Sequence, residues 1–273
     1  MNSPFVLREL DGLAELEQAV QLQYAVWGAD DQPESSSLMI AMQHEGALSA
    51  GAFVPDGTLA AYVFAFPTRD PQIQHSHRLA VHERYRRHGL GVRLKWFQHD
   101  WCATRGITLV RWTFDPLRAP NADLNMRRLG ATAQTYFEDY YGVMGGINGQ
   151  IPSDRFLAEW YVGSSFVVQR RASSQRDLPP IHTIPALNHV EDEVPTEIQL
   201  DSDAPTLAFY IPHDFGRIVH KQPDLAIAWR NHTRQILPHY FARGYCVTDF
   251  HREANAYVLE HTAHRSAPST TMR

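Results

Sequence analysis

The chain has 273 residues, of which 44% are hydrophobic, so it can build a full core without disulfide or metal support. It carries 25 Lys and Arg against 30 Asp and Glu, a net charge of -5 without long runs of like charge, which argues against general nucleic-acid binding. Cys102 and Cys246 form no CxxC pair, the N-terminus lacks the apolar core of a signal peptide, and no apolar stretch is long enough to span a bilayer. We therefore expect a cytoplasmic protein.

The first 165 residues predict an alternation of strands and helices. Residues 12–27 carry apolar side chains at three-to-four spacing, which is typical of an amphipathic helix. Pro55-Asp56-Gly57 joins two apolar runs and predicts a β-hairpin. The elements expected in chain order are a strand over 5–10, a helix over 12–27, a short helix after Pro33, strands over 47–54, 58–66 and 74–81, a helix ending near Gly106, a strand over 107–114, a short helix over 120–129, and strands over 132–141 and 156–162. This order predicts an α/β (α+β) fold, with helices packed on the faces of a mixed sheet.

The composition changes in the second part of the chain. Prolines among charged and small residues from 170 to 205 predict a linker or an extended arm. A strand over 206–211, a helix over 224–243 that Pro238 should kink, and a strand over 245–250 predict a small β-α-β addition. This addition is too short for its own core, so we expect it to dock on the main domain or to exchange across a homodimer. The expected division is 1–165 for the main domain, 166–205 for the linker, 206–262 for the addition and 263–273 for a flexible tail.

A basic turn with two glycines, Arg86-Arg87-His88-Gly89-Leu90-Gly91, joins the strand over 74–81 to the next helix. The N-terminus of a helix attracts anions through its free backbone N–H groups and its dipole, and the glycines let a phosphate approach the backbone. The turn lacks the Gly-Lys-Ser/Thr ending of a Walker loop and the three glycines of a Rossmann fingerprint. It predicts a pyrophosphate site, and a plain surface loop is the alternative.

The longer string LAVHERYRRHGLG, from Leu79 to Gly91, resembles the acyl-CoA motif of the GNAT superfamily of N-acyltransferases. The resemblance covers residues 5–163 at the level of the fold and is sharp over 75–91. It implies a mostly antiparallel sheet and a cosubstrate that is acetyl-CoA or another acyl-CoA. The cofactor-binding residues that it implies are Leu79, Ala80 and Val81 for the pantetheine arm, Arg86, Arg87, His88, Gly89, Leu90 and Gly91 for the pyrophosphate, and Asn121 and Asn125 beside the CoA arm. For the two asparagines, helix capping or a surface position is the alternative.

His75 and His77 lie two residues apart on a predicted strand, so both rings should point to one face. An amine must lose a proton to attack a thioester, and a histidine with a pKa of about 6.5 can accept it near neutral pH. The segment from His75 to Val81 is similar to the strand of arylalkylamine N-acetyltransferases in which a His-x-His pair serves this proton transfer. A polar strand face or a pair of metal ligands is the alternative, although no third or fourth ligand is evident nearby.

The general acid is harder to place. Many members of the superfamily carry a tyrosine in the helix after the next strand, where it donates a proton to the departing thiolate. In this chain Met126 occupies that position, and the family's Leu-Gly-Phe ending is replaced by Leu129-Gly130-Ala131. Tyr136, Tyr140 and Tyr141 lie just downstream and could replace the helix tyrosine, with Tyr136 as the first candidate, and a core or wall position is their alternative role.

The segment around Arg155 and the C-terminal addition resemble a GNAT subgroup, some of whose members transfer acyl groups, including succinyl, to amino acids. This resemblance implies that Arg155 binds a carboxylate of the acceptor or of a succinyl group, because its planar fork suits bidentate pairing. A surface or structural salt bridge is the alternative role for Arg155.

Together these features lead to one hypothesis and one rival. We expect transfer of an acetyl or other short acyl group, including succinyl, to a small-molecule amine such as an amino acid, by direct attack in a ternary complex. No metal, nucleic acid or membrane partner is expected, a homodimer is the candidate assembly, and both cysteines read as buried small hydrophobic residues. The rival is a non-catalytic acyl-CoA-binding or sensor protein with the same fold.

Overall fold

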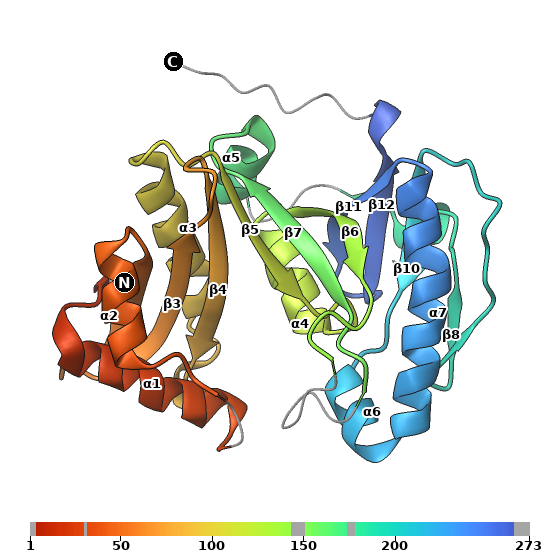
Figure 1. The fold of residues 1–273 in the computed structure, drawn as a ribbon. Coiled ribbons are helices and arrows are strands. Elements are labelled where there is room, and N and C mark those ends of the chain that lie inside the picture. The colour runs from red at the N-terminus through yellow and green to blue at the C-terminus, as the bar shows by residue number, and fades with distance from the viewer. Residues whose placement is uncertain (1–3, 30–31, 143–150, 174–177, 265–273) are drawn as a thin grey trace. The chain divides into compact units, whose positions relative to one another are not determined.

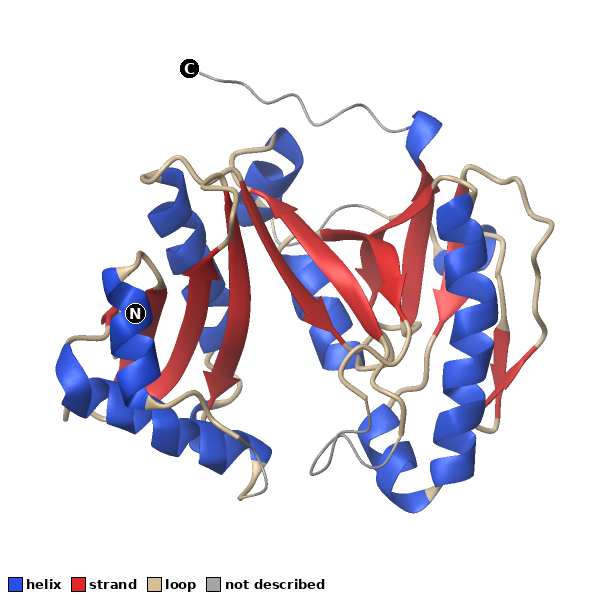
Figure 2. Ribbon diagram, in the orientation of Figure 1, coloured by secondary structure: helices blue, strands red, loops and turns tan. Residues whose placement is uncertain are grey.

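A computed structural model describes residues 4–29, 32–142, 151–173 and 178–264. The chain divides into two compact units, Met1–Trp112 and Thr113–Arg273 (Figure 1). Each unit has its own strands and helices (Figure 2). The domain boundaries predicted from the sequence stay predictions, and most of the predicted flexible tail, residues 265–273, lies outside the described residues.

Unit 1 is a sheet with helices on both faces (Figure 1). Its strand order is β1-β2-β3-β4-β5, in which β4 and β5 are parallel and the other neighbours are antiparallel. The strands are β1 (Val6–Glu9), β2 (Leu48–Phe53), β3 (Leu59–Pro67), β4 (Ile73–Val81) and β5 (Leu109–Phe114), which ends at the start of unit 2; the helices are α1 (Gly12–Trp27), α2 (Ser36–His44) and α3 (Leu90–Ala103). All eight elements match the sequence predictions, because their periodicity is strong and their ends carry clear turn or cap residues.

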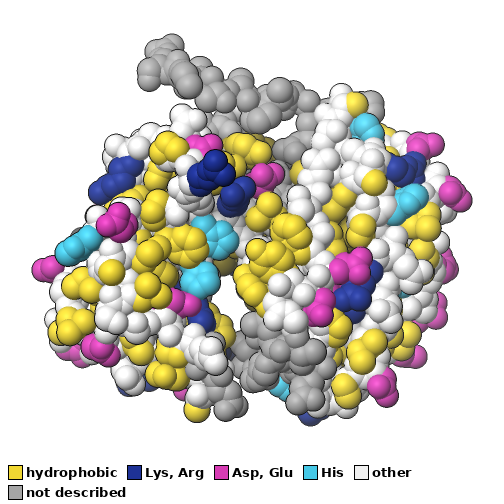
Figure 3. Space-filling model, viewed as in Figure 1, with side chains coloured by type: hydrophobic (Ala, Val, Ile, Leu, Met, Phe, Trp, Pro, Cys, Tyr) yellow, Lys and Arg dark blue, Asp and Glu magenta, His cyan; other side chains and the backbone are white. Residues whose placement is uncertain are grey.

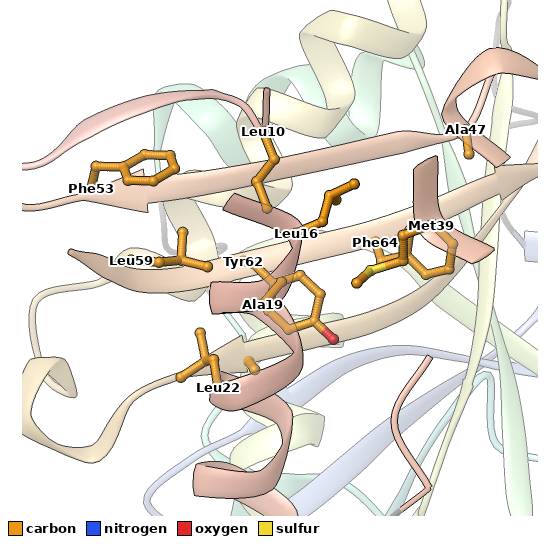
Figure 4. Close-up of a cluster of buried hydrophobic side chains, with 11 residues drawn as sticks. Leu10, Leu16, Ala19, Leu22, Met39, Ala47, Phe53, Leu59, Tyr62 and Phe64 are labelled. Carbon is orange, nitrogen blue, oxygen red and sulfur yellow. The ribbon is translucent and has the colours of Figure 1, made fainter. Parts of the chain in front are cut away.

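The core of unit 1 lies between α1, α2 and one face of the sheet (Figure 4). Leu16 and Ala19 of α1 and Met39 of α2 pack against Tyr62 and other strand residues, and all four are fully buried. The start of α2 is fixed by Ser35, whose side chain accepts a hydrogen bond from the backbone N–H of Leu38 at 3.2 Å. This packing holds the segment before α2 close to β4.

Unit 2 contains an antiparallel sheet with the strand order β7-β6-β11-β12-β10. Its strands are β6 (Thr132–Phe137), β7 (Arg155–Tyr161), β10 (Thr206–Tyr210), β11 (Tyr245–His251) and β12 (Ala256–His261), with a separate hairpin of β8 (His189–Glu191) and β9 (Val194–Thr196); its helices are α4 (Ala119–Ala122), which continues as a π-helical turn over Asp123–Arg128, α5 (Ser165–Ala172), α6 (Phe215–Lys221) and α7 (Pro223–Ala242). Val247 of β11 pairs with Ala133 of β6, so the C-terminal addition docks on a strand that precedes it.

The structure differs from the sequence prediction at several places in unit 2. The strand predicted over 132–141 ends at Phe137, where Asp139 adopts a positive φ of 45° and turns the chain. The stretch predicted as a linker contains α5, capped by the side chain of Ser164, and the β8–β9 hairpin. The addition contains α6 and β12 besides the predicted β-α-β elements. The helix predicted over 224–243 is present as α7, and it contains Pro238.

No helix in the described ranges combines the length and the apolar character needed to cross a membrane. On the face shown in Figure 3, acidic and basic side chains are scattered among neutral and hydrophobic ones. Cys102 and Cys246 are both buried, as the sequence predicts.

Candidate functional site

Strand β4 carries both predicted histidines, and a β-bulge sets their directions. Arg78 pairs with Phe64 of β3, and Ser76 pairs with the next residue of β3, Ala65. His77 is therefore an extra residue in β4, a β-bulge. Ser76 points toward α3, where its hydroxyl lies 3.2 Å from Oε1 of Gln98. The bulge breaks the usual alternation, and His77 and Arg78, although adjacent, both reach the same carboxylate on the other face.

That carboxylate belongs to Glu34, which the sequence analysis did not identify. Its Oε1 lies 2.7 Å from Nε2 of His77, and its Oε2 lies 2.9 Å from Nε of Arg78. The backbone of Glu34 is fixed by the buried side chain of Gln23, which accepts from its N–H at 3.2 Å. Arg78 also lies over the ring of Trp27, 4.6 Å from its centroid. Glu34 is thus held from α1 and from β4.

The electrostatics of this group favour a charged Glu34. Burial raises the pKa of Glu34, but the hydrogen bond from His77 and the charge of Arg78 outweigh burial and lower the pKa below its usual value. The side chains are partly shielded from water, with 32% of His77 and 14% of Glu34 exposed. A carboxylate that accepts from one imidazole nitrogen fixes the ring and its tautomer, and it stabilises the ring when the other nitrogen takes up a proton.

His75 lies beside His77, with 6.1 Å between ring centroids, and stacks on Phe66 at 4.9 Å. The structure thus brings the two predicted histidines together on one face, around one aromatic ring. Burial, with smaller contributions from His77, Arg111 and Lys95, lowers the pKa of His75 to about 4. His75 is therefore neutral near pH 7 and is a weaker base than an ordinary histidine.

Behind β4, on the side of α3, lies a buried polar network that the sequence analysis missed. Nζ of Lys95 donates to Oε1 of Gln98 at 2.7 Å and to Oγ of Ser76 at 3.1 Å, and it lies 3.8 Å from the centroid of the Trp112 ring. Burial lowers the pKa of Lys95 to about 7. The network ties α3 to the strand that carries the histidines, and it gave no sequence signal because Lys95 lies in an amphipathic helix like any surface lysine.

The predicted pyrophosphate turn leads directly into α3. Gly89, the N-cap of α3, has a positive φ of 68°, and Arg87 shares this left-handed conformation with a φ of 71°. An added Cβ at Gly91 would lie 3.7 Å from the side chain of Leu79, so this first turn packs closely on β4. The side chains of Arg86, Arg87 and His88 are exposed around it. The geometry offers backbone N–H groups and basic side chains to an anion.

The other edge of β4 is relevant to the predicted pantetheine contacts. Strand β4 pairs in parallel with β5 from Ile73 to His75. Beyond His75, within the described part of unit 1, β4 pairs with β3 alone. Leu79, Ala80 and Val81 therefore lie where β4 has left its other neighbour. Their backbone groups on that edge are candidate partners for an extended ligand.

The remaining predicted residues lie in unit 2. Asn121 is exposed and Asn125 is buried on the segment of α4 and its π-helical turn, and Met126 is fully buried. The hydroxyl of Tyr136 donates to Oδ2 of Asp154 at 2.5 Å. Burial and the charge of Asp154 raise the pKa of Tyr136 well above its usual value. The structure thus gives Tyr136 a structural hydrogen bond, and its role as a general acid stays a prediction.

Arg155 opens β7 and is buried, with Nη1 donating to the backbone oxygen of Asp154 at 2.8 Å. Its guanidinium lies over the ring of Tyr141, 5.3 Å from the centroid. Nearby, Arg230 and Asp115 form a bidentate ion pair that sequence reasoning could not find, because 115 positions separate the partners. Among the described residues, no group of three or more His, Cys, Asp or Glu side chains is arranged to hold a metal ion.

Comparisons with known proteins give one family and several similar structures. Residues 14–131 match the family model described as the acetyltransferase (GNAT) family. No curated protein matches the chain. The chain is similar to the ribosomal-protein-S18-alanine N-acetyltransferase from Escherichia coli, with 20% identity and a TM-score of 0.48, over 58% of this chain and 94% of that one. Ard1 from Thermoplasma volcanium is 15% identical with a TM-score of 0.47, and the match covers 59% of this chain and 99% of that one. A GNAT acetyltransferase from Streptococcus pneumoniae is 16% identical with a TM-score of 0.49, and the match covers 58% of this chain and 99% of that one.

Proposed function

Because residues 14–131 match the model of the GNAT family of acetyltransferases, we propose that the chain transfers an acyl group from acyl-CoA to the primary amine of a small molecule, with His77 as the base. The observation that carries this proposal is the hydrogen bond of 2.7 Å between His77 and Glu34 on a strand of the matched domain. It supports a base that is oriented by a carboxylate and half-shielded from water.

In this proposal, acyl-CoA lies along the edge of β4 and ends at the turn before α3. The pantetheine arm pairs with the backbone of Leu79–Val81, and the pyrophosphate meets the first turn of α3 and Arg86 and Arg87. The splayed register of β4 and β5 supports the first contact, and the left-handed Gly89 supports the second. These assignments extend to His88, Leu90, Gly91 and the two asparagines as further candidate contacts.

The proposed chemistry is direct attack. The amine nitrogen forms a bond to the thioester carbonyl carbon, its proton passes to His77 directly or through one water, and the C–S bond then breaks to release the CoA thiolate, which takes up a proton. An ordinary thiol has a pKa of about 8.5, so the thiolate is a good leaving group without a strong acid. The absence of the family's helix tyrosine, where Met126 is buried, is therefore compatible with turnover.

Finer features of the function remain proposals of the same kind. We propose an acetyl or succinyl donor and an amino acid as the acceptor, with Arg155 as a carboxylate-binding residue. The predicted location is the cytoplasm, and the candidate assembly is a homodimer. The location and the homodimer stay predictions.

The test is an assay of thiol release from acetyl-CoA and succinyl-CoA, each offered with a panel of amines and of L- and D-amino acids. Turnover with one pair above the rate of hydrolysis supports the proposal and identifies the acceptor class. No thiol release with any pair of the panel, together with calorimetric binding of CoA, would instead support a non-catalytic acyl-CoA-binding protein.

A further inference from the structure

Helix α3 contacts β4 on both sides of the β-bulge at His77. Before the bulge the contact is polar. Nε2 of Gln98 donates to Oε1 of Gln74 at 2.7 Å. Nζ of Lys95 donates to Oγ of Ser76 at 3.1 Å. These four side chains are buried, with at most 6% exposed, so Gln74 and Ser76 both point toward α3 in a contact closed to water.

After the bulge, the same helix contacts β4 through apolar side chains. An added Cβ at Gly91, in the first turn of α3, would lie 3.7 Å from the side chain of Leu79 and 3.9 Å from that of Val81. Even-numbered residues of β4 thus face α3 up to Ser76, and odd-numbered residues face it from Leu79 onward. A strand makes this change where one residue is inserted, and the pairing with β3 places that residue at His77. The contacts of α3 therefore require the bulge.

The bulge decides which side chains reach Glu34 on the opposite face of β4. His77 and Arg78 contact its two oxygens at 2.7 and 2.9 Å. In a regular strand Arg78 would face α3 as Ser76 does, and only His77 would remain on the side of Glu34. The hydrogen bonds that hold Ser76 against α3 therefore also hold the arrangement around the histidine.

Lys95 provides one of these hydrogen bonds at a cost. Burial of its amine lowers the pKa to about 7, and a methionine would fill a similar space without that penalty. Methionine could not donate to Ser76, however, nor to Oε1 of Gln98, which Nζ of Lys95 reaches at 2.7 Å. Charged or neutral, the amine has the two N–H groups that these acceptors need. The hydrogen bonding of Lys95 thus does not depend on its charge.

We propose that Lys95 is a positioning residue for the base, because it holds Ser76 against α3 and so maintains the bulge that turns His77 toward Glu34. Lys95 lies on the face of β4 opposite the histidines, so it acts through the strand. The inference rests on the proposed role of His77 as the base. In this arrangement Nε2–H of His77 donates to Glu34, which leaves Nδ1 to accept the proton of the amine.

The tautomer of His77 tests the inference without any substrate. With the full chain labelled with ¹⁵N in histidine, long-range ¹H–¹⁵N spectra at pH 7.5 should show the His77 proton on Nε2, and His77→Gln identifies the signal. Lys95→Met and Ser76→Ala should each produce a mixture of both tautomers. The double variant should go no further than either alone, because both changes remove the same hydrogen bond.

A matched control and a kinetic measurement separate positioning from packing. Cys102→Ala removes a buried group of α3 that donates to Gln74 rather than to Ser76, so the tautomer should stay as in the wild type. With activity established, Lys95→Met should lower kcat at least about tenfold, while the KM of acyl-CoA stays within about twofold. Circular dichroism and melting establish that each variant is folded, and Ser76→Ala carries the test if Lys95→Met does not fold.

Three results would overturn the inference. The first is a wild-type His77 with its proton on Nδ1. The second is an unchanged tautomer in the folded Lys95→Met or Ser76→Ala variant. The third is the same mixture in Cys102→Ala, which would make the effect one of general packing. None of these depends on turnover, so an absence of thiol release would contradict the proposed function alone and leave the tautomer measurement unaffected.

Discussion

Oε1 of Glu34 lies 2.7 Å from Nε2 of His77, so a carboxylate ahead of α2 and an imidazole on β4 form one hydrogen-bonded pair. Arg78 holds the second oxygen of the same carboxylate at 2.9 Å. The β-bulge at His77 makes this double contact geometrically possible, because without it two adjacent strand residues would face opposite sides. The pair resembles the carboxylate–histidine arrangements that orient general bases in other enzymes.

Replacing Glu34 should lower the rate more than it lowers acyl-CoA binding. A hydrogen bond to a charged group is worth about 1.5–3 kcal/mol, which corresponds to roughly 10- to 150-fold in rate. We expect Glu34→Gln to lower kcat by such a factor while the KM of acyl-CoA stays within about twofold, and Glu34→Asp to recover part of the loss. The control is Glu17→Gln, which removes a carboxylate of α1 that accepts from Ser36. An unchanged kcat in Glu34→Gln would show that the pair is only structural.

His75 should contribute to acid sensitivity rather than to the pH profile of the reaction. Its pKa is lowered to about 4 in the folded chain, against about 6.5 when unfolded, so the unfolded state binds a proton first as the pH falls. Stability should therefore decrease between pH 6.5 and pH 4. Between pH 7 and pH 5, urea denaturation should show a loss of stability that is smaller by about 2 kcal/mol in His75→Gln than in the wild type. Equal losses in both proteins would contradict the shift.

Lys95 should make stability rise toward alkaline pH. Its pKa is lowered to about 7 in the fold, against about 10.4 in an unfolded chain, so the unfolded state holds the proton more tightly between these values. From pH 7 to pH 9.5 the wild type should gain on the order of 2–3 kcal/mol relative to Lys95→Met, measured by urea denaturation. Parallel pH dependences of the two proteins would mean that the network keeps Lys95 charged throughout.

Gly89→Ala should separate the cost of the left-handed turn from its role in binding. The residue has a φ of 68° and no neighbour within 4 Å of an added Cβ, so the substitution should cost only backbone strain of about 1 kcal/mol. Gly57→Ala, with a φ of 85° and equally open surroundings in the β2–β3 turn, is the matched control for stability. Calorimetry should show weaker CoA binding in Gly89→Ala and unchanged binding in Gly57→Ala. Equal CoA binding by the two variants would show that the turn at Gly89 does not bind CoA.

The sequence predicts much of unit 1 and less of unit 2, for a physical reason. Local signals such as the three-to-four spacing in α1, the Pro55-Asp56-Gly57 turn and the glycine before α3 lie within a few residues of the elements that they specify. The strand β12 and helix α6 carry weaker local signals, and their formation depends on packing within unit 2.

In the candidate site, too, local features could be predicted from the sequence and long-range contacts could not. His75 and His77 could be predicted to share a face because one strand carries both, although the bulge could not be foreseen. The partner of His77 lies 43 positions away, and that of Asp115 lies 115 positions away, so only the folded chain brings them together. Lys95 could not be distinguished from a surface lysine, because burial depends on what packs above the helix.

The most direct test of the central claim is thiol release by the wild type and by the His75→Ala, His77→Ala double variant, measured with the best acceptor while CoA affinity is followed by calorimetry. If the base lies on β4, the double variant loses at least about a hundredfold in kcat and binds CoA as the wild type does. A double variant that keeps both its rate and its affinity would contradict the assignment of the base to this strand.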